Sequence, residues 1–487
     1  MKRSILFIAA AVLLFSISAK PAEGSPARGL ENRKEWFNIN LKNSKVGYTF
    51  TAYEPAEYGG RECLKFSTYM KFGLLRMGSP VEMEAEGTAF ITSELVPLYF
   101  KFTERQAAKE KTVEGVLNKD NLSLTINVAG QETHKDIVYE ENAIFADAGD
   151  FFARRKGLRD GEKFTVRVFN PDSLTFEDLK CSVYFDKENK GGFVLHTEVL
   201  GVDTVHYLDK DGNTIRSTVP ALGAEMVKTG EKDALAFAPS ELDIMKETCV
   251  ASNISIKNTS MVTALEARMS FKNAVPERLK SNLPAGAELS ADGRSILFKN
   301  KRDNFPEAAA LPLPVRAKEL TRYLIPSTYE QSADSRIIAA AVDAAGDEKN
   351  SYRAAKKIIY WVNHYLNKKN FNTGFASALE ALTGRQGDCK DHSVLAIAML
   401  RAAGIPARAS AGLFPLGSKF YYHMWVEAYV GQWVALDPTF DEAPADAAHI
   451  KLNDGVLDEA GRYNLMLDIL QYFDKISIEI LKLEEKG

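Results

Sequence analysis

The stretch QGDCKDHSVLAIAMLRAAGIPAR, residues 386–408, places one cysteine, Cys389, directly before an apolar run. Apolar residues recur at helical spacing between positions 394 and 400, which predicts a buried helix. Gly404 and Pro406 follow, and these two residue types commonly end a helix. The stretch therefore predicts a helix that begins near a thiol.

The position of Cys389 makes it a candidate nucleophile. Asp388 is a good N-cap residue, so Cys389 falls at the first helical position. The positive end of a helix stabilises a thiolate, and only the thiolate attacks efficiently. Lys390 and His392 add positive charge nearby. The alternative reading is a small buried hydrophobic residue, which is a common use of cysteine.

A base and its orienting acceptor come from a later hairpin. Residues 421–430, YYHMWVEAYV, alternate like a strand and place His423 on a face that also carries aromatic side chains. Asp437 ends the next predicted strand, 14 residues after His423. A two-residue loop would put these side chains on opposite faces, whereas a three-residue loop at 430–432 puts them on the same face. The sequence permits this loop without requiring it.

The segments GDCKDHSVLAIAMLRAAGIPAR and YHMWVEAYVGQWVALDPTF resemble the transglutaminase-like superfamily, whose core is papain-like. The resemblance covers roughly residues 325–455, and no position of the triad is substituted. It implies Cys389 as nucleophile, His423 as general base and acid, and Asp437 as the residue that orients His423. It also implies a peptide or protein substrate whose amide bond is opened through a thioester, without a cofactor.

Other polar residues near the motifs have simpler explanations. The resemblance offers the indole N–H of Trp361 as a second oxyanion donor, and the alternative is a core tryptophan. Asp391 and His392 favour a place on the helix surface or a supporting role. His364 lies on an amphipathic helix and is typical of a surface residue. Glu427 shares the face of His423 and is read as a cross-strand charge.

Two further features receive no catalytic role. His449, in DAAHIKL, resembles a recurrent feature of bacterial relatives, but the sequence gives it no mechanism, so it is left out of the catalytic set. The basic segment 366–370 is read as a solvated turn. The segment DKDGN, residues 209–213, is read as a β-turn, because a calcium loop needs its glycine at the sixth position and a glutamate at the twelfth.

The N-terminal residues predict export. Lys2 and Arg3 precede an apolar run that is too short to span a bilayer, and small residues follow it. We expect a signal peptide over 1–19, a flexible leader over 20–33, and no transmembrane segment once the signal is removed. The expected location is the periplasm or the outside of the cell.

The rest of the chain divides by its hydrophobic period. Residues 34–249 read as short antiparallel strands of a β-rich accessory domain, and residues 250–324 as a small β-rich linking domain. Residues 325–487 read as an α+β, papain-like or transglutaminase-like domain. An amphipathic helix at about 456–483 is expected to close the chain. The predicted fold class is α+β multidomain.

Composition narrows the function. The 487 residues carry a formal net charge of −4, which argues against a nucleic-acid partner. The four cysteines form no CxxC pair and the seven histidines show no zinc spacing, so we expect neither a metal centre nor a redox pair. At most one disulfide among Cys63, Cys181 and Cys249 is expected.

The sequence thus predicts an exported cysteine enzyme that acts on amide bonds as a protease, deamidase or transamidase. The competing hypothesis is a non-catalytic binding or scaffold protein of the cell envelope that uses its β-rich domains. The sequence does not identify the substrate, the acyl acceptor, an envelope partner or the oligomeric state.

Overall fold

The computed structural model describes most of the chain in two compact units. One unit ends at Ile244 and the other begins at Met245. The predicted signal peptide, 1–19, and all but the last two residues of the leader, 20–33, lie outside the described residues. The described residues are 32–106, 109–128, 130–146, 158–186, 192–199, 201–210, 212–316, 318–369, 375–472 and 475–486.

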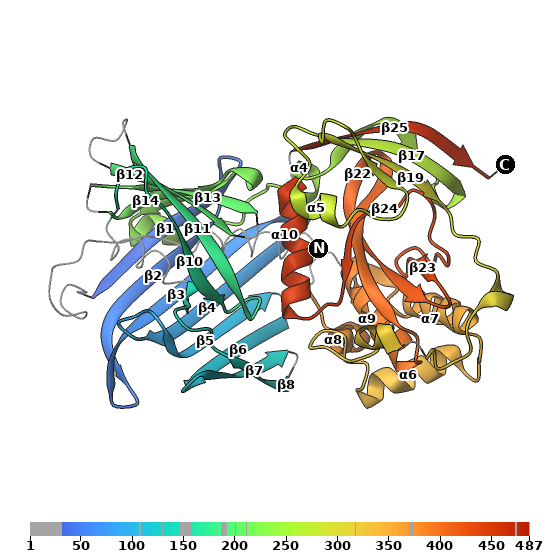
Figure 1. Cartoon of the computed structure of the whole chain (residues 1–487), viewed down its shortest axis with the longest axis horizontal. Coiled ribbons are helices and arrows are strands. Elements are labelled where there is room, and N and C mark those ends of the chain that lie inside the picture. The colour runs from blue at the N-terminus through green and yellow to red at the C-terminus, as the bar shows by residue number, and fades with distance from the viewer. Residues whose placement is uncertain are drawn as a thin grey trace. The chain divides into compact units, whose positions relative to one another are not determined.

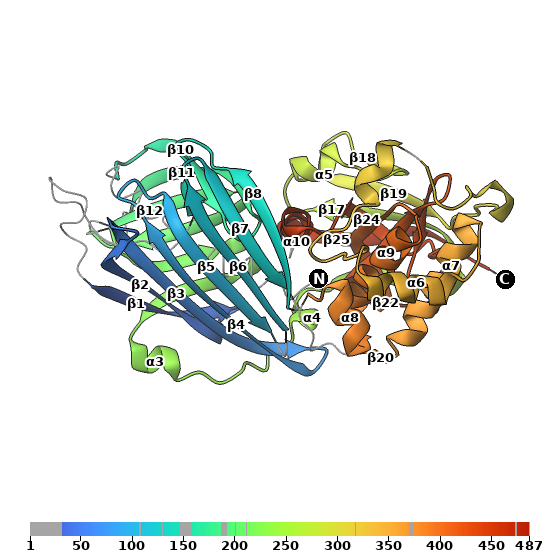
Figure 2. The same ribbon diagram turned by 90° about the horizontal axis from the view of Figure 1, so that it is seen from below.

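The N-terminal unit is one large sheet (Figures 1 and 2). Its 15 strands lie in the order β8-β7-β6-β5-β4-β3-β2-β1-β15-β14-β13-β12-β11-β10-β9. The strands are β1 Arg33–Leu41, β2 Ser44–Tyr58, β3 Arg61–Arg76, β4 Ser79–Ile91, β5 Pro97–Gln106, β6 Lys109–Asn118, β7 Asn121–Val128, β8 Gln131–Val138, β9 Ile144–Phe145, β10 Lys163–Asn170, β11 Thr175–Asp186, β12 Gly192–Val199, β13 Val202–Leu208, β14 Thr214–Val219 and β15 Ala224–Thr229. Two short helices follow, α3 Glu231–Leu235 and α4 Ile244–Glu247.

The sheet curves so that strands far apart in its order meet. The backbone N–H of Phe145 donates to the carbonyl of Leu95 at 2.8 Å. The ring of Phe100 on β5 lies 5.5 Å from that of Phe145 on β9 and 5.8 Å from that of Phe169 on β10. All three phenylalanine side chains are buried. The strand-like alternation of 34–249 therefore builds an antiparallel sheet with an aromatic core, as the sequence predicts.

The C-terminal unit combines a second sheet with helices. Its sheet has the order β18-β19-β17-β25-β16-β22-β23, and β24 pairs with β22. The strands are β16 Val250–Ile256, β17 Val262–Phe271, β18 Ala287–Leu289, β19 Ser295–Lys301, β22 Ala407–Tyr429, β23 Trp433–Leu436, β24 Ile450–Gly455 and β25 Ile476–Glu485, with a separate pair of β20 Lys368–Lys369 and β21 Gln386–Gly387. The helices are α5 Glu277–Ser281, α6 Ser335–Ala345, α7 Ser351–Tyr365, α8 Ala378–Gly384, α9 Cys389–Ala402 and α10 Glu459–Tyr472.

Helix α9 is the central element of this unit. It contacts α6, α7, α8 and β22, and the side chains from Lys390 to Arg401 are buried. Figure 1 shows α9 among the helices, beside the long strand β22. The apolar run in the opening stretch therefore forms a core helix rather than a surface helix. Its predicted start at Cys389 is confirmed.

Two expectations about the C-terminal unit need correction. The helix expected at about 456–483 ends at Tyr472, and β25 follows it. Ile476, Ile478 and Ile480 alternate with polar residues, a strand period that pairs β25 with β17 and β16. The strands of the expected linking domain, 250–324, belong to the same sheet as β22 and β25, so the two segments share one compact unit.

The smaller sequence predictions have clear outcomes. All four cysteines are free thiols, so no disulfide forms among Cys63, Cys181 and Cys249. At the predicted turn of 209–213, the N–H of Gly212 donates to the carbonyl of Asp209 at 3.0 Å, which is the hydrogen bond of a β-turn. Among the described residues, no helix has the length and apolarity that a membrane crossing requires.

A buried ion pair fixes the C-terminal end of α9. The Nη1 atom of Arg401 lies 2.8 Å from Oε2 of Glu330, and both side chains are fully buried. The same guanidinium donates to the carbonyls of Ala407 and Ile325, and Glu330 also accepts from the N–H of Leu457. These contacts attach α9 to the start of β22 and to the segment after β24.

We predict that Glu330→Gln destabilises the C-terminal unit by about 3–5 kcal/mol, because it leaves the Arg401 charge buried without its carboxylate. Urea unfolding followed by tryptophan fluorescence measures this change, since three of the four tryptophans lie in this unit. Glu479→Gln is the control, because the Glu479–Arg268 pair is exposed and such pairs contribute less than about 1 kcal/mol. Equal midpoints for the two variants would contradict the assigned role.

Candidate active site

Cys389 sits at the first turn of α9, and the chain before it is held by a capping box. Oδ1 of Asp388 accepts from the N–H of Lys390 at 2.9 Å, and Oδ2 of Asp391 accepts from the N–H of Asp388 at 2.8 Å. Gly387 leaves room for this arrangement, since a Cβ there would lie 2.3 Å from the Cβ of Asp391. The thiol is therefore presented at a rigid helix N-terminus, and the residue is largely buried.

The three residues that follow Cys389 on its helix are structural in this arrangement. Lys390 is fully buried and its ammonium pairs with the carboxylate of Asp388. Asp391 is buried within the capping box. His392 is also buried, and its Nδ1 lies 2.8 Å from the carbonyl of Asp388. The helix-surface alternative for Asp391 and His392 is therefore wrong, and both support the turn that carries the thiol.

His423 comes from β22, which is held beside α9. The hydroxyl of Ser393, one helical turn after Cys389, donates to the carbonyl of Met424 at 3.1 Å. Because Met424 follows His423 directly, this bond fixes the position of His423 relative to the start of α9. The histidine and cysteine side chains act on each other electrostatically: His423 lowers the pKa of Cys389, and Cys389 helps to raise the pKa of His423.

Asp437 reaches His423 through the hairpin that the sequence permits. Tyr429 pairs with Trp433, so the loop between β22 and β23 has three residues, 430–432. His423 and Asp437 therefore share a face, and Nε2 of His423 lies 2.6 Å from Oδ2 of Asp437. Since Nε2 is occupied by the carboxylate, Nδ1 is the nitrogen left to face the thiol.

The electrostatics of the site favour a charged Cys389–His423 pair. Burial opposes ionisation of the thiol, but the hydrogen bond and charge of His423 outweigh it and lower the pKa of Cys389 to about 7. Burial also disfavours the imidazolium, yet Asp437 and Cys389 outweigh it and raise the pKa of His423 to about 10. Between these values, the thiolate and the imidazolium coexist.

Asp437 is fully buried, and three donors compensate its charge. They are the Nε2 atoms of His423 and His449, at 2.6 and 3.0 Å, and the N–H of Thr439 at 2.7 Å. Burial raises the pKa of this carboxyl, but the two histidines dominate and hold it well below its usual range. Asp437 therefore stays ionised at every pH at which the protein is expected to function.

Aromatic side chains enclose the imidazole. The rings of Phe414, Phe440 and Trp425 lie 5.2, 5.4 and 6.1 Å from the His423 ring. Trp425 and Phe414 are buried, and Phe440 is 37% exposed. This apolar wall strengthens the His423–Asp437 interaction by excluding water from it.

Sequence reasoning missed the segment that supports Asp437. Asp437 and Glu442 exchange backbone hydrogen bonds of 2.8 and 2.9 Å, which closes a tight loop. Within the segment after that loop, Nδ1 of His449 lies 3.0 Å from Oδ1 of Asp446. The available signal was the concentration of Glu442, Asp446 and His449 among small apolar residues, a composition that is unusual for a solvated loop.

Within the part of the chain that the structure describes, two groups of buried side chains have donor atoms within 4.8 Å of one another, a spacing that could hold a metal ion. They are His423, Asp437 and His449, and Glu442, Asp446 and His449. In both groups the histidine nitrogens are directed at carboxylate oxygens, and these contacts are hydrogen bonds. A metal would have to displace them, so the contacts give no reason to assign one. The absence of a metal centre stays a prediction.

Among the described residues, the other side chains considered at the sequence level have partners other than Cys389. The indole N–H of Trp361 donates to Oδ2 of Asp343 at 2.8 Å, so its proposed role as oxyanion donor is wrong. His364 is exposed on α7, as expected. In the basic segment 366–370, Lys368–Lys369 forms β20, and residue 370 lies outside the described residues.

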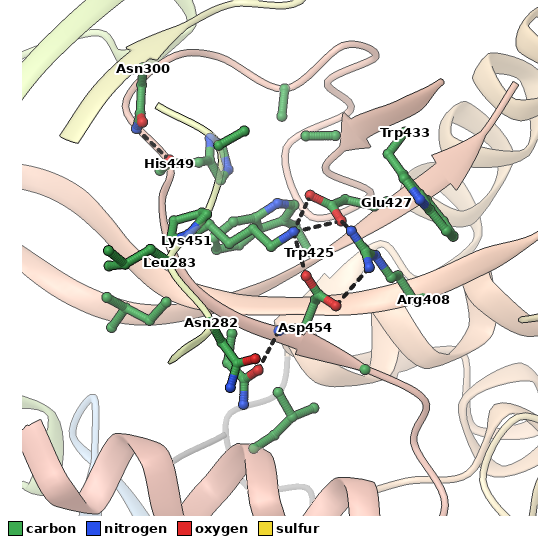
Figure 3. Close-up of a pocket in the computed structure, with 18 of the residues that line it drawn as sticks. Asn282, Leu283, Asn300, Arg408, Trp425, Glu427, Trp433, His449, Lys451 and Asp454 are labelled. Carbon is green, nitrogen blue, oxygen red and sulfur yellow. Dashed lines mark hydrogen bonds and ion pairs between the residues drawn. The ribbon is translucent and has the colours of Figure 1, made fainter. Parts of the chain in front are cut away.

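A cavity of about 850 Å³ lies on the face of β22 that carries Glu427 (Figure 3). In its wall, Arg408 and Lys451 each pair with both Glu427 and Asp454, at distances of 2.6 to 2.8 Å. Glu427 is therefore a cross-strand charge, as expected. His449 also lines this cavity, so the same imidazole touches the cavity and the carboxylate of the triad.

Comparison with known proteins agrees with this geometry. Residues 338–438 match the sequence model of the transglutaminase-like superfamily. That segment contains Cys389, His423 and Asp437. No curated protein matches the chain significantly.

Three solved structures are similar to parts of the chain. A candidate cysteine protease from Cytophaga hutchinsonii is 18% identical, covers 46% of this chain and 86% of its own, and has a TM-score of 0.30. A β-barrel-like protein of a domain of unknown function from Brucella abortus is 12% identical, covers 41% and 95%, and has a TM-score of 0.27. A Pseudomonas aeruginosa protein from another uncharacterised family is 11% identical, covers 36% and 90%, and has a TM-score of 0.22. At these scores the similarity defines no shared activity.

The C-terminal unit thus carries a thiol at the start of α9, a histidine on β22 and an aspartate just after β23 whose carboxylate pairs with that histidine. This unit contains a transglutaminase-like region, residues 338–438, which follows a large antiparallel sheet. Members of this superfamily are typically cysteine-dependent enzymes.

We predict that alkylation of Cys389 by iodoacetamide rises with pH around a midpoint of about 7. In His423→Ala the thiol loses the partner that lowers its pKa, so the midpoint moves to 9 or above, since 9.0 is its ordinary value and burial raises it. At neutral pH this change lowers the alkylation rate by about 50-fold, because the rate follows the thiolate fraction. Peptide mass spectrometry measures the rate, and identical midpoints in the two proteins would contradict the pairing.

Proposed function

We propose that this protein is an exported cysteine enzyme that opens amide bonds of peptides or proteins through a thioester. One observation carries the proposal. The thiol of Cys389 interacts with the imidazole of His423, and that imidazole pairs with the carboxylate of Asp437. Nucleophilic catalysis requires this sequence of nucleophile, base and orienting acceptor. The lowered pKa of the thiol supports the same role, because an activated nucleophile needs its charge near neutral pH.

In the first half-reaction, the Cys389 thiolate attacks the amide carbonyl carbon and a C–S bond forms. The negative charge moves to the carbonyl oxygen, where the backbone N–H of Cys389, at the first position of α9, is a suitable donor. The His423 imidazolium then gives its Nδ1 proton to the leaving nitrogen. The C–N bond breaks, the amine departs, and a thioester on Cys389 remains.

In the second half-reaction, the now neutral His423 removes a proton from the acyl acceptor. Water as acceptor gives hydrolysis, and an amine gives transamidation. The acceptor adds to the thioester carbonyl, the C–S bond breaks, and Cys389 leaves as a thiolate beside the restored imidazolium. Asp437 remains ionised throughout and holds Nε2 of His423, so the ring presents Nδ1 in both steps.

We predict that the protein converts peptides of the bacterial cell envelope when they are incubated with it and a primary amine. Mass spectrometry of the products identifies the bond that is opened and shows whether water or the amine accepts the acyl group. Cys389→Ala abolishes conversion, and His423→Ala lowers it by about 10²- to 10⁴-fold, the usual contribution of a general acid–base. His364→Gln is the matched control, because this histidine is exposed on α7.

The competing function is a non-catalytic binding or scaffold protein of the cell envelope. A separation of more than about 5 Å between the Cys389 sulfur and the His423 ring nitrogens would favour it, because a base must reach the proton that it takes. The effect of each side chain on the pKa of the other supports the enzyme, because it depends on their being close together. Conversion that is equal in wild type and Cys389→Ala would support the scaffold.

We also propose that the protein is exported to the periplasm or beyond. We predict that a bacterial host carrying the full-length gene yields a processed protein in its periplasmic fraction or medium, with a new N-terminus after residues 16–19, where small residues follow the apolar run. Removing residues 2–19 should retain the protein in the cytoplasm. Intact-mass analysis of each fraction measures this, and an unprocessed chain confined to the cytoplasm would contradict export.

A further inference from the structure

His449 is a buried imidazole whose two nitrogens both meet carboxylates. Nε2 lies 3.0 Å from Oδ2 of Asp437, and Nδ1 lies 3.0 Å from Oδ1 of Asp446. Only 7% of the residue is exposed. A buried imidazole with two acceptors carries two N–H groups, so it is present as a cation that bridges the two carboxylates.

His449 contacts the triad at Oδ2 of Asp437, the same oxygen that accepts the hydrogen bond from His423. Oδ2 of Asp437 accepts from Nε2 of His423 and from Nε2 of His449, while its Oδ1 accepts from the N–H of Thr439. The rings of the two histidines lie 5.7 Å apart, with Phe414 within 5.2 Å of both. Donors on both oxygens fix the rotation of the carboxylate, and that rotation sets the direction in which His423 points.

The far end of the bridge is anchored by the segment 442–449. The N–H of Ala448 donates to Oδ1 of Asp446 at 2.8 Å, and the N–H of Asp446 donates to Oε2 of Glu442 at 2.9 Å. Glu442 returns to Asp437 through the paired backbone hydrogen bonds. The segment therefore forms a closed ring of polar contacts that leaves Asp437 through its carboxylate and returns to its backbone.

The charges around the bridge explain what it does to His423. Asp437 and His423 face His449 on one side, Asp446 and Glu442 lie on the other, and the cavity wall beyond carries Lys451 paired with Glu427 (Figure 3). Burial opposes the charge on His449, yet Asp437 and Asp446 outweigh it and raise its pKa to about 9. The Asp437 carboxylate thus interacts with two imidazolium groups. Each imidazolium weakens the attraction of the carboxylate for the other.

We propose that His449 is a positioning residue that fixes the Asp437 carboxylate and limits how strongly it holds the proton on His423. This role rests on the proposed function of the triad. His449 does not touch the reacting atoms. It acts through Asp437, so that His423 is aimed at Cys389 and can release its proton to a leaving group.

The test is the pH dependence of Cys389 alkylation by iodoacetamide in the full-length protein, followed by peptide mass spectrometry. Wild type should show two inflections, one for the thiol and one at higher pH, where His423 loses its proton and the free thiolate reacts faster. His449→Leu removes both the donor and the charge beside Asp437. The upper inflection should then rise by about one pH unit, because Asp437 acts on His423 alone.

Two further variants separate positioning from folding. His449→Gln keeps a neutral N–H donor for Asp437 and should move the upper inflection by less than His449→Leu does. If the His449→Leu protein does not fold, the shift in His449→Gln tests the positioning role. His364→Gln should leave both inflections in place. With the substrate identified by the peptide screen, His449→Leu should lower kcat by about 10- to 100-fold with KM unchanged, since a small misplacement of a catalytic group has that effect.

The outcomes separate this proposal from the proposed function. If wild type shows no lowered thiol inflection, the triad itself is not activated and the proposed function fails. If wild type shows it and the profiles of His449→Leu and His449→Gln superimpose on the wild-type profile, His449 has no positioning role. A uniform loss of rate with unmoved inflections also overturns the proposal, because it indicates a structural effect alone.

Discussion

The buried carboxylate of Asp437 is the constraint on which the rest of the site depends. A fully buried charge is costly unless donors surround it, and breaking such an arrangement is strongly destabilising. Here the donors come from β22, from the chain just after β23 and from the segment before β24. Satisfying this one group therefore fixes three pieces of chain relative to one another, and His423 takes its orientation from them.

Helix α9 supplies the other half of the geometry. A reacting pair must be held within a fraction of an ångström, which calls for rigid elements rather than loops. The buried body of α9, the Ser393–Met424 hydrogen bond and the Glu330–Arg401 pair hold this helix at both ends against β22. The thiol is therefore positioned by the core of the unit, beside the imidazole that lowers its pKa.

The parts of the site that follow local rules were predictable from the sequence. Asp388 as a helix cap and the three-residue loop at 430–432 are choices that backbone chemistry restricts to a few options. His449 was not predictable in the same way, because residues 437–449 lack a helical or strand period, and their contacts arise only when Asp437 is buried. The sequence could not decide between the two alternatives for Trp361, because its partner, Asp343, lies on another helix.

The boundaries between elements were also only partly predictable from the sequence. The alternating isoleucines of β25 carried a strand signal, but the helical pattern just before them obscured it. The large antiparallel sheet was predictable as a class from its many short alternating runs. Its order was not, because the pairing of β1 with β15 joins residues that are far apart in the sequence.

The most direct test of this account is the protonation state of His423, read from the ¹⁵N chemical shifts of its ring nitrogens at pH 8. The pKa values of about 7 for Cys389 and about 10 for His423 predict protons on both nitrogens in the wild type. In Cys389→Ala the imidazolium loses its thiolate partner, so its pKa falls. A neutral ring in the wild-type protein at that pH would contradict the thiolate–imidazolium pair and the chemistry derived from it.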